Sequence, residues 1–160
     1  MILDLPPGTG DIQLTLTQKI KMTGAIIVTT PQDIALSDVR KGADMFRKVN
    51  TPVLGVIENM SGFQLSGKTS SPDSKILIGN KELEIDNDGN FNLNIDIFKK
   101  DGGQKESERL GVPLLGKIPL SKDIMNATDA GIPIVISAPD NGISKVYFSL
   151  AEKMSKIIKD

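Results

Sequence analysis

One stretch of the sequence has the residue types and spacing of a phosphate-binding loop. Residues 62–69, GFQLSGKT, match the P-loop template G-x-x-x-x-G-K-[ST], with Gly62, Gly67, Lys68 and Thr69 in its fixed positions. In that motif successive backbone N–H groups wrap a phosphate at the start of a helix. A true match would place a nucleotide site here.

The residues around this match argue against a phosphate site. A P-loop needs a strand before it and a helix that begins at its Gly-Lys pair. The apolar run 53–57 supplies the strand, but Thr69 is followed by Ser-Ser-Pro-Asp and then by residues of period two. We therefore predict that residues 62–69 form a loop that enters a β-hairpin.

A second stretch, residues 3–11 with the sequence LDLPPGTGD, carries a carboxylate at a predicted strand end. Asp4 closes an apolar run, residues 6–10 force a tight loop, and Asp11 can cap the helix that follows. Ligands of α/β proteins bind at the carboxyl ends of parallel strands, where a carboxylate can hold Mg²⁺ or its water shell. A structural turn with a capping aspartate is the alternative interpretation.

Two further predicted strands also end in residues suited to ligand binding. Glu58 and Asn59 follow one apolar run, and an asparagine offers both a donor and an acceptor to the edge of a base. Pro119 and Leu120 end another strand in an apolar turn that can line a flat aromatic ligand. A polar turn would explain Glu58 and Asn59, and each feature alone is a weak signal, but three loops at strand ends favour one shared crevice.

Strands alternating with helices must position these loops. Segments of helical period lie between several of the apolar runs, which predicts an α/β fold with a mainly parallel sheet flanked by helices. The predicted strands are 2–5, 25–28, 53–57, 114–118 and, more weakly, 132–136. The predicted helices cover 34–49, a short segment that Ser121 caps and Gly131 ends, and the apolar stripe from Ile143 to Ile158.

Residues 64–100 break the alternation of strands and helices. A Gly79-Asn80 turn separates two short apolar segments, and a second turn signal at 87–90 precedes alternating apolar residues from Phe91 to Ile97. We predict a β-hairpin-like insertion here.

The composition limits the number of domains and the classes of ligand and partner that the chain can have. The 160 residues suit one domain, and a net charge of −1 gives no electrostatic reason to expect nucleic-acid or membrane binding. The chain has no cysteine and no histidine, so it offers no thiolate metal ligand. With no signal peptide or membrane-spanning run, we expect a cytoplasmic protein. Because the sequence starts inside an apolar run, we also expect that an N-terminal portion is missing.

Four strings together resemble the Mrp/ApbC family of iron–sulfur cluster carrier P-loop ATPases, which are related to MinD and ParA. These are DLPPGTGDIQLTLTQ, GAIIVTTPQDIALSDVRKGADMF, VLGVIENMSGF and ERLGVPLLGKIPL. The resemblance covers about 1–63 and 97–160. It implies a deviant-Walker α/β sheet, ATP with Mg²⁺, a homodimer, and transfer of an iron–sulfur cluster to apo-proteins.

By position in that resemblance, Asp4 matches the Walker B aspartate, which acts on the Mg²⁺ shell. Residues 6–11 match the switch II loop, which implies catalytic roles for Gly8 and Asp11 beside Asp4. Asn59 matches the asparagine of the adenine pocket.

Pro119 and Leu120 match the loop on the other side of the base.

The resemblance also locates two departures from the family's pattern. The family's phosphate loop precedes the Asp-Leu-Pro-Pro-Gly string, so this chain is expected to lack it. Many members carry a Cys-x-x-Cys pair where this chain has residues 64–67, so no cysteine is present here to bind a cluster.

These observations lead to one hypothesis and two alternatives. Residues 1–160 are predicted to form the C-terminal part of a single P-loop NTPase domain that binds and hydrolyses ATP and serves iron–sulfur protein assembly. The partners implied are ATP, a second copy of the chain and apo iron–sulfur proteins. The alternatives are a MinD/ParA-like ATPase fragment and a non-catalytic interaction module, both without cluster binding.

Overall fold

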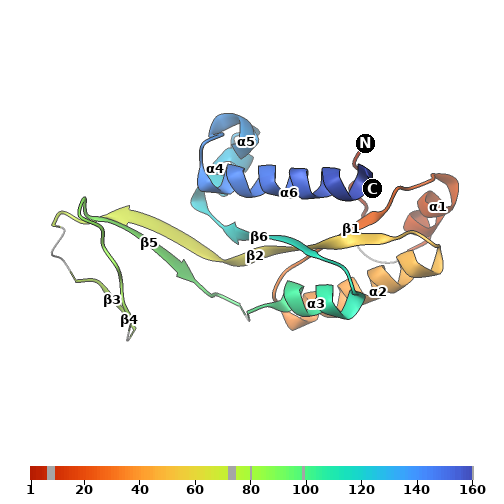
Figure 1. The fold of residues 1–160 in the computed structure, drawn as a ribbon, viewed down its shortest axis with the longest axis horizontal. Helices are drawn as coiled ribbons and strands as arrows, with labels where there is room; N and C mark the ends of the chain where they lie inside the picture. The colour runs from red at the N-terminus through yellow and green to blue at the C-terminus, as the bar shows by residue number, and fades with distance from the viewer. Residues whose placement is uncertain (7–9, 72–74, 80, 99, 160) are drawn as a thin grey trace.

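A computed structural model describes residues 1–6, 10–71, 75–79, 81–98 and 100–159. A central sheet lies between two layers of helices, and a long β-hairpin projects from one end of the sheet (Figure 1). Helices α2 (Asp33–Lys48) and α3 (Gly102–Leu110) cover one face, and α6 (Gly142–Lys159) covers the other. The α/β fold predicted from the alternating pattern is confirmed.

Three parallel strands form the body of the sheet. The strand β2 (Val53–Lys68) lies between β1 (Ala25–Thr29) and β6 (Leu114–Leu120), and it runs parallel to both. All three apolar runs had been predicted as strands. β2 continues well past the expected end at Ile57, and this extension changes the surroundings of the candidate site.

Each face of the sheet has its own apolar core. On the α2 and α3 side, Ala43, Phe46 and Leu110 pack against Ile27 and Val56 of the strands. On the α6 side, the buried cluster comprises Ile57, Leu115, Ile118 and Leu150. Alternate residues of a strand point to opposite faces, so Val56 and Ile57 serve different cores.

The chain between β6 and α6 is helical. Ser121 caps α4 (Lys122–Asp129) as predicted, because its hydroxyl oxygen accepts the N–H of Asp123 at 3.1 Å. Gly131 follows that helix with a φ of +69°, a conformation that favours glycine. The weak strand prediction for 132–136 is wrong: Ile134–Ser137 form the short helix α5, and the described neighbours of α5 are helices α4 and α6.

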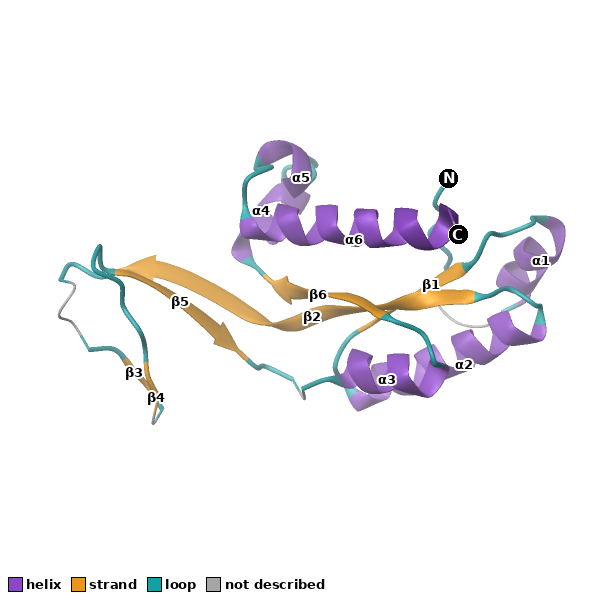
Figure 2. Ribbon diagram, in the orientation of Figure 1, coloured by secondary structure: helices purple, strands orange, loops and turns teal. Residues whose placement is uncertain are grey.

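The hairpin consists of the second half of β2 and the strand β5 (Asn90–Ile95), which are antiparallel (Figure 2). The strand β5 pairs with the same edge of β2 as β1, which pairs nearer the start of β2, because β6 pairs with the opposite edge. The predicted small hairpin is also confirmed: β3 (Leu77–Ile78) pairs with β4 (Lys81–Glu82). The sheet is thus mixed because residues 64–100 add an antiparallel strand to the parallel ones.

The predicted strand at residues 2–5 is wrong. These residues lie outside the sheet, and the side chain of Ile2 is 82% exposed. Only Leu5 packs against the core on the α2 side. A strand needs a neighbour for its backbone hydrogen bonds, and within the described residues β1 pairs with β2 alone.

No described helix is long and apolar enough to cross a membrane.

Candidate functional site

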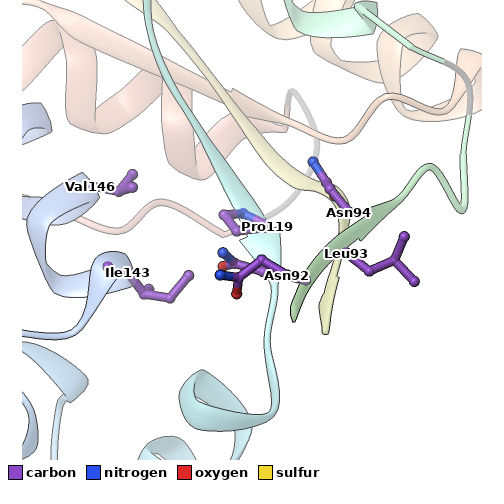
Figure 3. A pocket seen from close by; sticks show the side chains of 8 residues that line it. Asn92, Leu93, Asn94, Pro119, Ile143 and Val146 are labelled. Atoms are coloured by element: carbon purple, nitrogen blue, oxygen red, sulfur yellow. The ribbon is translucent and has the colours of Figure 1, made fainter. Parts of the chain in front are cut away.

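The structure brings Pro119 to a cavity of about 300 Å³ beside the carboxyl end of β6 (Figure 3). The cavity lies between the hairpin and the first turns of α6, with Asn92 on one side and Ile143 on the other. Its lining combines carboxamide side chains with apolar ones and contains no charged residue. It is therefore suited to a neutral, flat group rather than to a phosphate.

The other two residues predicted to contact a base lie close by in the sheet. Asn59 pairs with Ile118, the residue before Pro119, and its side-chain oxygen accepts the N–H of Met60 at 2.9 Å. Leu120 pairs with Phe63. Neither side chain lines the cavity, so the structure places these residues at the same end of the sheet and brings only Pro119 into the cavity.

The residues predicted to act on Mg²⁺ belong to a different part of the molecule. Asp4 is exposed, and Gly8 lies outside the described residues. Asp11 does not cap the helix α1 (Asp11–Lys19) as predicted. Gly10 takes the N-cap position, and Asp11 is the first helical residue, where its charge still favours the positive end of the helix.

A buried glutamine connects α1 to the preceding loop through a hydrogen bond. Gln13 is 4% exposed, and its side-chain nitrogen donates a hydrogen bond to the carbonyl oxygen of Pro6. Sequence reasoning missed this residue because a polar side chain in the first turns of a helix gives no signal of burial.

The described residues contain no group of three or more acidic side chains arranged to hold a metal ion. Asp4 is one exposed carboxylate, which matches the way Mg²⁺ binds proteins through one or two carboxylates with nucleotide phosphates and water. An iron–sulfur cluster does not fit this chain, because cluster ligands are chiefly thiolates and the sequence has no cysteine.

Glu58, expected as a polar strand-end residue, is a buried structural group. It is 2% exposed, and its carboxylate accepts the backbone N–H of Gly103 at 2.6 Å. Its other oxygen lies 3.7 Å from the amino group of Lys117, which also donates to Asp101 at 2.6 Å. The carboxylate therefore holds the start of α3 against β2 and satisfies a free N–H of that helix.

The ion pair beside Glu58 shifts two pKa values. The hydrogen bond to Asp101 is the main cause that raises the pKa of Lys117, and burial opposes it. The same hydrogen bond lowers the pKa of Asp101. Both groups thus stay charged at neutral pH. The pairing escaped sequence reasoning because the two residues lie sixteen positions apart.

A second buried carboxylate joins α2 to α3. Glu106 is 1% exposed and accepts hydrogen bonds from Arg109, the shortest at 2.6 Å, and from Arg40 at 3.3 Å. The hydrogen bond that Arg109 donates to Glu106 is the main cause that raises the pKa of Arg109. Arg40 therefore connects α2 to α3 through a partly exposed ion pair.

The P-loop match does not form a phosphate loop, which agrees with the prediction from its sequence context. The predicted loop is nevertheless wrong, because residues 62–68 fold as a strand. Residues 62–68 belong to β2, and Lys68 pairs with Asn90 in the ladder. Gly67 is needed for packing, since a Cβ there would lie 2.5 Å from the ring of Phe91. Backbone N–H groups arranged in a strand point alternately to either side, so they cannot converge on a phosphate.

Comparison with known proteins identifies a family. The model of the ParA group described as "NUBPL iron-transfer P-loop NTPase" matches residues 1–93 and 87–155. The two matched pieces overlap at residues 87–93, around the start of β5.

Curated relatives match along nearly the whole chain. An iron-sulfur cluster carrier protein of Aquifex aeolicus is 40% identical over 99% of this chain and 37% of its own length. The mouse iron-sulfur cluster transfer protein NUBPL is 41% identical over 99% of this chain and 43% of its own. The chain thus spans less than half the length of these relatives.

Solved structures share the fold. A nucleotide-binding protein of Archaeoglobus fulgidus, solved in complex with ADP, has a TM-score of 0.55 and 29% identity over 79% of this chain and 43% of its own. The cell division ATPase MinD of Pyrococcus furiosus has a TM-score of 0.54 at 24% identity, covering 84% of this chain and 43% of its own. The MinD likeness concerns the fold alone.

Proposed function

The chain belongs to the ParA group of NUBPL-type iron-transfer P-loop NTPases, and we propose that it serves iron–sulfur protein assembly as part of an ATP-dependent cluster carrier. The observation that carries this proposal is the identity of about 40% with cluster carriers along 99% of the chain. We further propose that residues 1–160 are the C-terminal part of one P-loop NTPase domain. The cytoplasmic location and the homodimer remain proposals from the family.

In this proposal the chain supplies the base and Mg²⁺ sides of the nucleotide site. Asn59, Pro119 and Leu120 would hold the adenine at the carboxyl end of β2 and β6, and Asp4 would orient the Mg²⁺ shell. Catalysis of phosphoryl transfer depends on positioning and on electrostatic stabilisation. Gly8 and Asp11 would therefore act by placing their loop against the γ-phosphate.

The phosphate-binding amides must come from elsewhere than residues 62–69, because those residues form a strand. We predict that the isolated 160 residues bind ATP weakly, with no dissociation constant in the micromolar range. Calorimetric titration with MgATP tests this expectation. Micromolar binding that disappears in Lys68→Ala would overturn it and restore the P-loop assignment.

The cluster is cargo that this chain cannot ligate through cysteine. We propose that the thiolates lie outside residues 1–160 and that this chain takes part in the nucleotide-dependent step of transfer. Residues 64–67, in the hairpin, occupy the place of the cysteine pair that many members carry.

Removal of the chain from its cell tests the biological role. We expect the activity of iron–sulfur dehydratases to fall while cluster-free enzymes of the same extract keep theirs, and re-expression of the chain should restore activity. Unchanged dehydratase activity would refute the proposal and favour the non-catalytic module. Iron bound stoichiometrically by the anaerobically reconstituted 160-residue chain would refute the proposal that the cluster ligands lie outside these residues.

A further inference from the structure

The cavity beside Pro119 has a wall that comes from the hairpin. In the ladder between β2 and β5, Gln64 lies opposite Asn94, and Ser66 lies opposite Asn92. Side chains two residues apart along a strand share a face. Gln64, Asn92 and Asn94 therefore line the cavity from one face of the hairpin. Figure 3 labels the two asparagines.

These three carboxamides are not used by the fold. Within the described residues, none of their amide groups takes part in a side-chain hydrogen bond. By contrast, Asn90 on the same face donates to Asp86 at 3.1 Å, and Asn59 accepts from the backbone N–H of Met60. Each free carboxamide offers two N–H donors and one oxygen acceptor, so the wall presents both hydrogen-bonding functions to a ligand.

The opposite side of the cavity is apolar and firmly held. Ile143 is 3% exposed, and Val146 packs into the core on the α6 side. The side-chain oxygen of Asn141 accepts the N–H of Ile143 at 2.9 Å, which fixes the start of α6. Pro119 adds its ring at the end of β6. Apolar groups facing carboxamides suit a ring with an apolar face and a polar edge.

The size and the charge of the cavity narrow the ligand class. A volume of about 300 Å³ lies at the lower end of small-molecule sites. No charged side chain lines the cavity, so the site is adapted to a neutral ring. Asparagine and glutamine pair with the adjacent N7 acceptor and N6 donor of adenine through two hydrogen bonds.

We propose that the cavity binds an adenine ring and that Gln64, Asn92 and Asn94 read its hydrogen-bonding edge. The inference rests on the proposed function as a nucleotide-dependent carrier. It keeps Pro119 as the contact shared with the adenine site proposed there and places the residues that determine base specificity on the hairpin. The hairpin thereby gains a role in ligand selection.

The test is a titration of the isotope-labelled 160-residue chain with adenosine, guanosine and uridine, followed by NMR. Nucleosides isolate the base from the phosphate site. Adenosine at millimolar concentration should shift the side-chain amide signals of Gln64, Asn92 and Asn94 and the methyl signals of Ile143 and Val146. Guanosine and uridine should give shifts at least fivefold smaller at equal concentration.

Variants inside and outside the cavity distinguish direct contact with adenosine from a general effect on the hairpin. Asn92→Ala combined with Asn94→Ala should weaken adenosine binding about tenfold, because each lost hydrogen bond contributes modestly. Ser66→Ala, on the same face but outside the cavity, should leave the affinity unchanged. Asn92→Asp keeps the size of the side chain and removes its donors, so it should weaken binding even if the double variant misfolds.

Three outcomes would overturn the inference. They are equal shifts with all three nucleosides, no shift at 10 mM adenosine, and adenosine shifts confined to Asn59 and Leu120. The last outcome leaves the proposed function standing, because the base would bind at the residues that the family resemblance indicates. Failure of the proposed function appears separately, as unchanged dehydratase activity in cells that lack the chain.

Discussion

Glu58 offers the most direct test of how the site end of the sheet is held together. Its buried carboxylate accepts the N–H of Gly103 at the start of α3 and lies 3.7 Å from the amino group of Lys117. Glu58→Gln keeps the shape and one acceptor oxygen but removes the charge. A charged acceptor contributes about 1 kcal/mol more than a neutral one, and a carboxylate at a helix start about 0.3–1 kcal/mol, so Gln should cost about 1–2 kcal/mol.

Glu58→Ala removes the acceptor as well. The buried N–H of Gly103 then stays unpaired, which costs about 1–3 kcal/mol, and the lost packing adds to that cost, so a total of about 3–4 kcal/mol is expected. The interaction with Lys117 is left out of both totals, because Lys117 is 40% exposed and solvent screens it.

Urea unfolding followed by circular dichroism measures these losses, since the chain has no tryptophan to report by fluorescence. With a slope of about 2 kcal/mol per molar urea, the midpoint should fall by about 0.5–1 M for Gln and about 1.5–2 M for Ala. Glu152→Gln, at an exposed position of α6, is the matched control and should change the stability by less than about 0.5 kcal/mol. Equal midpoints for the control and Glu58→Gln would refute the role assigned to the charge.

Three further predictions concern turns and helix ends. Asp86 has a lowered pKa, chiefly because it accepts the backbone N–H of Asn90; its contribution to the turn is therefore complete above about pH 3.8 and is lost as the pH falls through the lower folded-state pKa. Hydrogen exchange of the Asn90 amide should show this loss, and Asp86→Asn should abolish the pH dependence. Gly102→Ala should destabilise the chain by about 1–3 kcal/mol in urea unfolding, since the new Cβ would lie 2.8 Å from backbone atoms of Pro31; an unchanged midpoint would contradict that packing. Ser121→Ala should cost about 0.5–2 kcal/mol through loss of the α4 cap, and Ser121→Asp should recover most of it.

Local patterns predicted the elements that bury their own apolar faces. The three parallel strands and the helices at 33–48 and 142–159 agree with their predicted positions to within a few residues at most ends. The helix α3 was not predicted, because its nine residues carry few apolar side chains and it is held by the buried carboxylates of Glu58 and Glu106. Contacts of that kind join residues far apart in the sequence, so no local period reveals them.

The candidate site was harder to predict because the sequence misplaced the end of β2. Met60 and Gly62 have positive φ values of 55° and 123°, and the pairing of β2 with β6 shifts between Asn59 and Phe63. This bulge lets β2 continue into the hairpin instead of stopping at Ile57. Pairing between strands separated by more than twenty residues leaves no local signature, so the extension could not be foreseen.

The longer strand changes which residues face a ligand. Glu58 and Asn59 were expected at an open strand end, but they lie inside β2, and Glu58 is taken up by α3. Among the described residues, the carboxamides of Asn92 and Asn94 have no side-chain hydrogen bond, and the hairpin carries them to Pro119. The stretch that matches the P-loop template thus forms part of the strand that pairs with β5, and it supports the carboxamide side of the cavity.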